Sequence, residues 1–380
     1  YLQRELQSPE GAFYAAQDAD SEGEEGIFYL WTWEELSQLL ENPQLEQMAG
    51  RFHLAPEGNF TPEPALLSRG HNILHGRPGE GTVDEEIRQR LLKARSRRSP
   101  PGTDTKVLTD WNGMIIAALA KAGRALADET LLAAAEGALD HLLRVASDES
   151  RHLYHRVCEG EVQSQELLDD YAFMIRGLLE LYQSRFNPRF LALAFDLAER
   201  AVALFRHPSG GFSMAPYDAE AIGGENRLLA DGAYPAGNSV MLGNLQILYQ
   251  LSGDSRWEEA LAGTLGAMDE TLRRHPRALL HTLSRLESRN RGLREIVLCG
   301  SRENRQTQTV LQRLGKLYLP ESFLIFKPDG EDELNKLLPF TAAMGSARGR
   351  PRVYICRDRS CSLPQEDTER VIAELESEAV

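Results

Sequence analysis

Six stretches in the middle of the chain carry apolar residues at every third or fourth position, which is the spacing of one helix face. They fall into three consecutive pairs: 112–127 with 129–146, 169–184 with 188–206, and 237–252 with 255–273. Short linkers, such as Phe186-Asn187-Pro188, separate the members of each pair. Links this short join antiparallel neighbours, so the pattern predicts three helix hairpins.

The two helices of a pair differ in where their polar residues lie. The first is apolar around nearly its whole circumference, whereas the second carries Glu, Arg and Asp along one side. A helix that is apolar all round is buried and an amphipathic helix faces solvent, so we expect inner and outer helices. A spacing of about 60 to 70 residues per hairpin is too long for the common short solenoid repeats. The sequence therefore predicts a mainly α fold, an (α/α) barrel or toroid of helix hairpins.

Short segments that alternate aromatic and polar residues next to glycines lie outside these helices. They are residues 11–17, 26–31, 151–157 and 210–215. This composition is typical of small β-hairpins, which we expect at one end of the barrel.

Two further helices are predicted nearer the start of the chain, at 33–52 and 83–98. Each is expected to open with a capping box, in which a Thr side chain and a Glu three residues later satisfy backbone N–H groups. The pairs are Thr32 with Glu35 and Thr82 with Glu85.

The chain changes character near residue 290. Buried strands are predicted at 294–300, 322–327 and 352–357, with amphipathic helices at 303–315 and 365–377. Alternating strands and helices predict a small α/β unit, so we divide the chain into a helical portion, 1–290, and an α/β portion, 291–380. No glycine-rich phosphate-binding loop marks the second portion as a nucleotide site.

Charge excludes several classes of partner. With 42 Lys and Arg against 57 Asp and Glu, the net charge is −15, which repels phosphate backbones and disfavours nucleic acid. No apolar run approaches the roughly 20 residues that cross a bilayer, so we expect no membrane partner. Four cysteines do not make a disulfide framework, and their number suits a reducing cytoplasm. Cys356 and Cys361 leave a structural role and a metal or redox role open.

Polar residues gather where each inner helix begins. The three clusters are Asp110-Trp111-Asn112, Asp169-Asp170-Tyr171 and Asn238-Ser239. Inner helices of antiparallel hairpins start at the same end, so these groups are expected to converge there. Carboxylates and amides bind hydroxyl groups and an aromatic ring covers the apolar face of a sugar, which predicts a site for a small sugar ligand. The alternative is that the same residues serve as helix N-caps.

An acidic loop precedes the hairpins. Asp18 and Asp20 resemble the start of a calcium loop, but Tyr29 stands where that loop needs a bidentate Glu. We expect the loop to join two strands and present both aspartates at the barrel mouth as acid or base, or else as solvated turn residues. The histidines are scattered, with His152 and His155 three apart on a strand, so no metal and no cofactor is predicted.

Four long motifs and the tail resemble one known family. They are residues 11–36, 106–120, 167–182, 231–240 and, at the tail, 356–365. The chain resembles the YyaL-type thioredoxin-domain proteins, whose vertebrate members are called spermatogenesis-associated. The residues of this chain that match the family's motif positions are Asp18, Asp20, Trp111, Asn112, Asp169, Asp170, Tyr171, Asn238 and Ser239. Ala236 departs from the Ser common at that position.

The resemblance implies an N-terminal thioredoxin-like domain followed by a six-hairpin, glycosidase-like helical region. Neither that domain nor the first hairpins precede residue 11 here, so we expect this chain to be the C-terminal portion of a longer protein with an incomplete barrel. The family resemblance assigns no reaction.

Two functions remain open. One is a carbohydrate-active protein, glycosidase-like or epimerase-like, with Asp18, Asp20, Asp169 and Asp170 as acid and base and with Trp111, Asn112, Tyr171, Asn238 and Ser239 binding the sugar. The other is a non-catalytic helical scaffold that supports a thioredoxin-like redox or chaperone domain. A buried carboxylate with a perturbed pKa favours the first, and satisfied helix caps favour the second.

Overall fold

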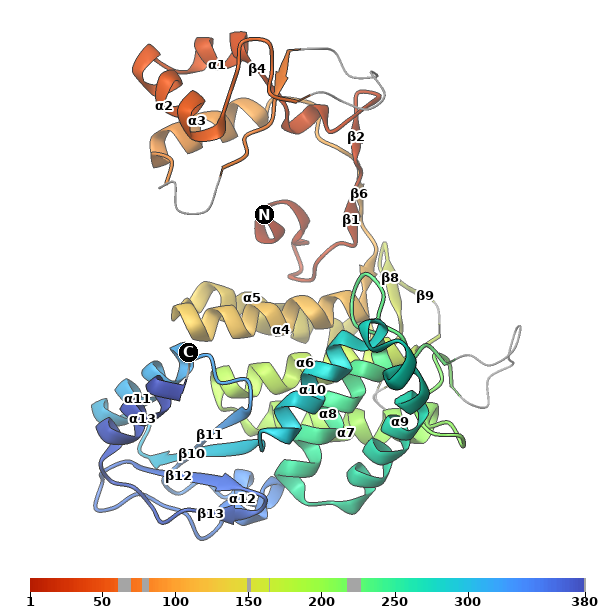
Figure 1. Ribbon diagram of the computed structural model, residues 1–380, viewed down its shortest axis with the longest axis vertical. Coiled ribbons are helices and arrows are strands. Elements are labelled where there is room, and N and C mark those ends of the chain that lie inside the picture. The colour runs from red at the N-terminus through yellow and green to blue at the C-terminus, as the bar shows by residue number, and fades with distance from the viewer. Residues whose placement is uncertain (61–69, 77–81, 149–151, 164, 217–226, 379–380) are drawn as a thin grey trace. The chain divides into compact units, whose positions relative to one another are not determined.

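The computed structural model describes residues 1–60, 70–76, 82–148, 152–163, 165–216 and 227–378 (Figure 1). The chain forms two compact units, one made of Tyr1–Tyr14 with Lys106–Val380 and the other of Ala15–Thr105. The predicted division at residue 290 marks the step from helices to strands, yet both sides of that step lie in the first unit. The reason is that one face of the C-terminal sheet shares a hydrophobic core with the helices.

The three predicted helix hairpins are confirmed, and they make the first unit a mainly α, incomplete (α/α) barrel. Inner helices α4, α6 and α8 pack side by side, and each is followed by an outer helix, α5, α7 or α9 (Figure 1). The bounds are α4 Thr109–Leu126, α5 Glu129–Val145, α6 Leu168–Arg185, α7 Pro188–Phe205, α8 Gly237–Ser252 and α9 Ser255–Arg274. Helix α10, Leu280–Asn290, packs against α8 after the 3-10 turn Pro276–Leu279.

The hairpin linkers contain the signals that end one helix and start the next. Ala127, Phe186 and Gly253 adopt a left-handed conformation that terminates the inner helix. The residue that follows, Asp128, Asn187 or Asp254, then accepts a hydrogen bond from the first turn of the outer helix. Each linker is short because both tasks are completed within two residues.

Burial follows the predicted division into inner and outer helices. Nearly every residue of α6 and α8 is buried, whereas α7 buries one face, including Leu191, Ala194 and Ala198. In α4 the buried residues recur at Asn112, Ile116 and Ala120, so this helix buries a face and not its whole circumference.

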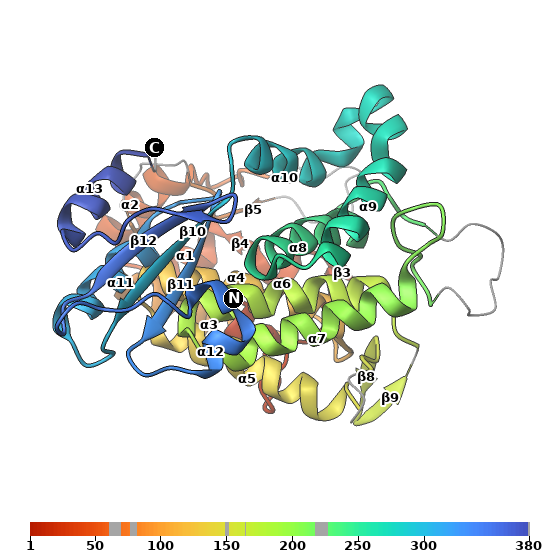
Figure 2. The same cartoon turned by 90° about the horizontal axis from the view of Figure 1, so that it is seen from below.

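The C-terminal part of the first unit is a four-stranded sheet with helices on the side away from the hairpins (Figure 2). Strand β10, Arg294–Gly300, lies between β11, Ser322–Pro328, and β12, Arg352–Arg357, and β13, Ser360–Cys361, forms the edge. The pairing is parallel for β10 with β11 and antiparallel for the rest. Helices α11, Arg305–Lys316, and α13, Thr368–Glu378, cover one face, and α12, Glu333–Leu337, follows β11.

Side chains alternate between the two faces of β10, which explains why both are buried. Ile296 and Leu298 pack under α11 and α13, while Val297 and Cys299 join the core of the hairpins. A disulfide joins Cys356 to Cys361 across β12 and β13. The cysteine count predicts no disulfide framework, and this single bond was not foreseen because the register that opposes the two residues comes from the sheet.

Short hairpin segments connect the helices, as the aromatic segments predicted. Strand β7, Val107–Leu108, pairs with β8, Arg156–Cys158, and β8 pairs with β9, Glu161–Gln163. Single antiparallel bridges also close the loop after the π-helix Leu2–Leu6, after α5 and after α7. They join Gln7 to Phe13, Ser147 to Leu153 and Arg206 to Phe212. The same kind of bridge therefore closes the loop after each of these three helices.

The described residues of the second unit form three short α-helices and several two-residue strands around their own core. The helices are α1, Trp33–Leu39, α2, Asn42–Phe52, and α3, Glu85–Arg95; the strands are β1 Ala16–Gln17, β2 Asp20–Ser21, β3 Glu24–Glu25, β4 Trp31–Thr32, β5 His71–Asn72 and β6 Thr103–Asp104. Strand β1 pairs with β6, β2 with β3 and β4 with β5.

Four expectations for this unit can be compared with its structure. The predicted helix 33–52 is two helices, because Pro43 starts a new first turn in α2. The capping box of Thr32 and Glu35 is confirmed, whereas Thr82 is not a cap: α3 begins after Asp84, which accepts from the backbone N–H of Glu86. The segment 26–31 is largely a 3-10 turn, Ile27–Tyr29, rather than a strand.

No helix among the described residues is both long and apolar enough to cross a bilayer.

Helices α4 and α6 cross at glycine. A Cβ atom at Gly113 would come within 2.6 Å of the backbone carbon of Phe173, which cannot move without moving α6. We predict that Gly113→Ala destabilises the first unit by about 1–3 kcal/mol and lowers its thermal midpoint in calorimetry. The exposed α9 residue Gly266 has open space around a Cβ. Gly266→Ala should therefore be neutral or stabilise by up to about 1 kcal/mol, and equal midpoints for the two variants would contradict the close crossing.

Candidate active site

A cluster of titratable groups forms where the inner helices begin, as the sequence predicted. Asp110 lies in the first turn of α4, and Asp169 and Asp170 lie in the first turn of α6. His155, which immediately precedes β8, completes the group, and atoms of Asp110, His155 and Asp170 lie within 4.8 Å of one another. Three of the four side chains are buried, so their charges are poorly solvated.

His155 and Asp170 form the innermost pair. The Nδ1 atom of His155 lies 2.9 Å from Oδ1 of Asp170, and the backbone N–H of Leu167 donates to Oδ2 at 2.8 Å. The hydrogen bond to Asp170 raises the pKa of His155, while burial raises the pKa of Asp170 and the neighbouring imidazole opposes that rise. With Nδ1 used by Asp170, Nε2 is the nitrogen through which His155 can act on a ligand.

Asp110 and Asp169 are two carboxyl groups poised to exchange protons near neutral pH. Burial and the charge of Asp170 raise the pKa of each to about 6. The imidazole of His155 moderates the rise in both cases. Asp169 also lies against Gly237, where a Cβ atom would come within 2.1 Å of its Oδ1. Glycine at the start of α8 is thus a steric requirement of the carboxylate on α6.

Two aromatic side chains border the carboxyl groups and reach solvent. Trp111 is half-buried, and Tyr234 is 39% exposed. Burial raises the pKa of the Tyr234 hydroxyl, as do the nearby charges of Asp110 and Asp169, and a hydrogen bond with Trp111 opposes the rise. The ring of Phe173 packs edge-on against that of Tyr234, with 5.9 Å between the ring centroids. The site therefore joins buried acids to accessible aromatic surface.

Three of the predicted sugar-binding residues form hydrogen bonds with the protein. The amide of Asn112 bonds both the N–H and the C=O of Phe13, at 2.8 and 2.9 Å. Asn238 does the same with Phe212, at 2.8 and 2.9 Å. Each of these asparagines joins a loop closed by a bridge to the next inner helix. We call such side chains helix ties. In the middle repeat, the Tyr171 hydroxyl takes this place and accepts from the N–H of Leu153 at 3.2 Å.

Ser239 is fully buried, and its hydroxyl accepts a hydrogen bond from Thr282 at 3.0 Å. Trp111 is the member of the predicted binding set that stands at the accessible edge of the acid cluster.

Asp18 and Asp20 lie in the second unit and are exposed, Asp18 just before the small β2–β3 hairpin and Asp20 in its first strand. The expectation that this acidic loop joins two strands agrees with the hairpin. Asp110, His155, Asp169 and Asp170 all lie in the first unit. The acid and base roles expected of Asp18 and Asp20 stay a prediction.

Three members of the site were missed as candidates from the sequence. Asp110 belongs to a polar cluster whose predicted ligand-binding members are Trp111 and Asn112. Tyr234 lies in the motif before α8, where its ring gave no signal beyond its place in that motif. His155 was expected to face away from His152, and the two do bind different carboxylates, Glu166 for His152 and Asp170 for His155.

Three residues of the cluster could also hold a metal ion. Asp110, His155 and Asp170 offer two carboxylate oxygens and an imidazole nitrogen, a donor set used for divalent cations. In this structure Nδ1 of His155 and Oδ1 of Asp170 are bonded to each other. The expectation of no metal stays a prediction.

Relatives exist in animals. The chain is 30% identical over 411 residues to human spermatogenesis-associated protein 20 and 31% identical over 414 residues to that of mouse, covering 97% of this chain and 52% of each relative. An uncharacterised protein of Caenorhabditis elegans is 27% identical over 402 residues. The chain thus spans about half the length of the curated relatives it matches. No protein-family model matches it.

Solved structures with a similar backbone include a sugar epimerase from a ruminal bacterium, with a TM-score of 0.37 and 21% identity over 44% of each chain. A cellobiose 2-epimerase from Bacillus thermoamylovorans has a TM-score of 0.35 and 19% identity, covering 42% of this chain and 43% of that one. A family 76 glycoside hydrolase from a bovine Bacteroides thetaiotaomicron strain has a TM-score of 0.37 and 12% identity, covering 69% and 53%.

The raised pKa of Asp169 makes stability depend on pH. Its carboxyl ionises near pH 4 when unfolded and near pH 6 when folded, so the native state binds more protons between these values. Stability is therefore lost as pH rises from about 4 to 6, by up to about 3 kcal/mol for a shift of this size. We predict that Asp169→Asn is more stable than the parent at pH 7.5 and that the gap closes at pH 4.5, as measured by urea unfolding.

The matched control is Asp140→Asn on the exposed face of α5, where the carboxyl is 55% exposed. This change should alter the free energy of unfolding by less than about 0.5 kcal/mol at either pH. A gap between Asp169→Asn and the parent that does not vary with pH would contradict the raised pKa.

Proposed function

The chain belongs to the YyaL-type family of spermatogenesis-associated protein 20, whose name specifies no reaction, and from the site itself we propose that the first unit is a carbohydrate-active acid–base enzyme. The substrate class is a small sugar bound at the inner-helix starts, and the reaction is glycosidase-like or sugar-epimerase-like. The observation that carries this proposal is the contact of His155 with Asp170 beside two further carboxyl groups, Asp110 and Asp169, with raised pKa values.

The residues of the cluster can be divided into a proton donor and proton acceptors. Asp170 is wholly buried and bonded at both oxygens, so it positions His155 and favours its protonated form. His155 then supplies a proton through Nε2, and ionised Asp110 or Asp169 accepts one from the sugar or from water. Both reaction types need such an acid and base on opposite sides of one bond or one carbon. A pKa of about 6 leaves each carboxyl mostly ionised at neutral pH but able to be protonated during turnover.

Sugar recognition rests on the two bordering rings. Trp111 and Tyr234 present partly exposed faces next to buried carboxylates, an arrangement that covers the apolar face of a sugar while acids bond its hydroxyls. The strongly acidic site also disfavours phosphorylated or carboxylated sugars, so a neutral substrate is expected.

A second function is favoured by the helix ties. Asn112, Asn238 and Ser239 are buried and bonded to protein groups, which is what a non-catalytic scaffold for a thioredoxin-like domain requires. Under this alternative the carboxyl cluster is a remnant, and the partner supplies the chemistry.

The deciding experiment is proton NMR of the chain with neutral mono- and disaccharides in D2O. Hydrolysis produces new reducing-end anomeric signals, whereas epimerisation exchanges a carbon-bound proton for deuterium. We predict turnover by the parent and a loss of about 100-fold or more in Asp169→Asn and His155→Gln, because each removes a proton-transfer group.

The control for these variants is Asp140→Asn, which should keep the parent rate. Turnover that all variants share would assign the activity to a contaminant. Absence of both turnover and any sugar-dependent rise in melting temperature would reject the enzyme and leave the scaffold, since a ligand at 100 times its Kd stabilises by about 2.7 kcal/mol.

A further inference from the structure

A cavity of about 120 Å³ lies at the other end of the inner helices from the acid cluster. Its walls are the C-terminal halves of α4 and α6, the middle of α8, the helix α10, and the start of β11 with the loop before it. Lys121 lies eleven positions after Asp110 in α4, which is about 16 Å along a helix. The cavity is therefore distinct from the candidate active site.

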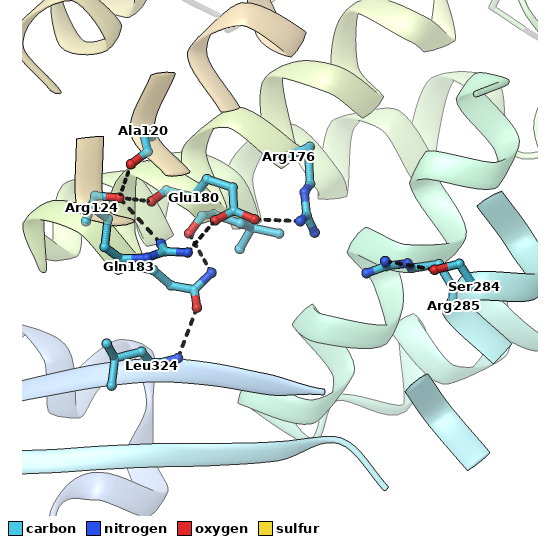
Figure 3. A network of polar contacts seen from close by, with 10 residues as sticks. Ala120, Arg124, Arg176, Glu180, Gln183, Ser284, Arg285 and Leu324 are labelled. Carbon is cyan, nitrogen blue, oxygen red and sulfur yellow. Dashed lines mark hydrogen bonds and ion pairs between the residues drawn. The ribbon is translucent and has the colours of Figure 1, made fainter. Parts of the chain in front are cut away.

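Positive charge dominates this cavity although the whole chain carries −15. Lys121 and Arg124 of α4, Arg176 of α6 and Arg285 of α10 line it, against one carboxylate, Glu180. In Figure 3, Arg176 and Glu180 lie on one side and Arg285 faces them from the other. Four cations and one anion leave a net charge of +3 in a confined space.

The carboxylate is already shared between two of the cations. Glu180 is 4% exposed and accepts from Arg176 at 2.5 Å and from Arg124 at 3.1 Å, and Figure 3 draws both bonds. Among the described residues, no carboxylate forms an ion pair with Arg285 or Lys121. Burial lowers the pKa of both, as does the neighbouring charge of Arg176. The cluster therefore holds positive charge that its own residues do not neutralise.

Two donors on the cavity wall also have no acceptor among the described residues. They are Nε of Arg285 and Nε2 of Gln246, both without access to solvent. Gln246 is 6% exposed, so its amide cannot turn outward to water. A buried donor left unpaired is destabilising, and such groups in native proteins ordinarily mark the place of a ligand or an ordered water.

We propose that this cavity binds a phosphate-type oxyanion, either inorganic phosphate or the phosphate group of a small metabolite. Arginine guanidinium groups match the geometry of phosphate oxygens, and a lysine adds a further charge. A single water needs roughly 10–15 Å³ of the same kind of space, so the cavity admits several non-hydrogen atoms and not a macromolecular segment. The oxyanion supplies the acceptors that Arg285 and Gln246 lack and neutralises the excess charge.

The test is isothermal titration of the full chain with inorganic phosphate and, separately, with a hexose monophosphate, each at an ionic strength matched with KCl. Saturable binding at one site is expected. A lower Kd for the ester would assign the phosphorylated metabolite, and equal or weaker binding of the ester would assign free phosphate. No saturable binding of either anion would overturn the proposal.

Two substitutions locate the site. Arg285→Gln should weaken phosphate binding at least about tenfold, since it removes a charged donor. Arg289→Gln, one turn later on α10 at an exposed residue that does not line the cavity, should leave the Kd unchanged. Equal effects of the two would show non-specific attraction and overturn the proposal.

Gln246→Met tests the site with a variant that should still fold, because it removes an unpaired donor without opening a cavity. This variant should melt at or above the parent temperature without phosphate, yet gain less than the parent when phosphate is added. A gain equal to that of the parent would contradict the role of Gln246. Asp169→Asn should bind phosphate as the parent does, which separates this site from the candidate active site.

Discussion

The close crossing of α4 and α6 at Gly113 and Gly177 is the constraint on which both ends of the first unit depend. Each glycine lies against the backbone of the other helix, where an added Cβ atom would meet it at 2.6 Å for Gly113 and 3.1 Å for Gly177. Because the axes approach this closely, Asp110 is brought beside Asp170 at one end and Arg124 beside Glu180 at the other. Side chains larger than hydrogen at the crossing would separate both pairs at once.

The two ends of this helix pair use burial in opposite ways. At the start, three carboxylates and one imidazole share a poorly solvated space, so negative charge accumulates and protons are held near neutral pH. At the far end, arginines and a lysine outnumber Glu180. The helix dipoles agree with both arrangements, because each helix start, which is positive, faces the carboxylates, and each helix end, which is negative, faces the cations. Backbone and side-chain charges are thus matched along the whole pair.

Much of the fold could be predicted from the sequence because its signals are local. The period of apolar residues and the short linkers located all six hairpin helices to within three residues. The sheet strands were equally clear, since runs such as Ile296-Val297-Leu298 are buried on both faces. The features that could not be predicted depend on how segments pair and pack in three dimensions. Neither the pairing of Cys356 with Cys361 nor the compact unit formed by residues 15–105 is written in a local pattern.

The place where the inner helices converge could be predicted from the sequence, but the contacts of the single side chains there could not. Convergence of the inner-helix starts was a matter of topology, and Asp169 and Asp170 are where it placed them. Whether an amide faces a ligand or the backbone of a neighbouring loop depends on that loop's path, which no spacing reveals. Asn112 and Asn238 bond to loops, and His155 enters the cluster from the segment before a strand.

The helix ties carry a consequence for how the barrel responds to mechanical or thermal stress. Asn112 and Asn238 each join an inner helix to a loop that follows a different, earlier hairpin element, rather than to their own hairpin partner. Neighbouring hairpins are thereby linked in a chain, in which releasing one loop exposes the start of the next inner helix. Fraying at one edge would then propagate hairpin by hairpin, and the acid cluster, which lies at these starts, would lose its geometry before the helices themselves melt.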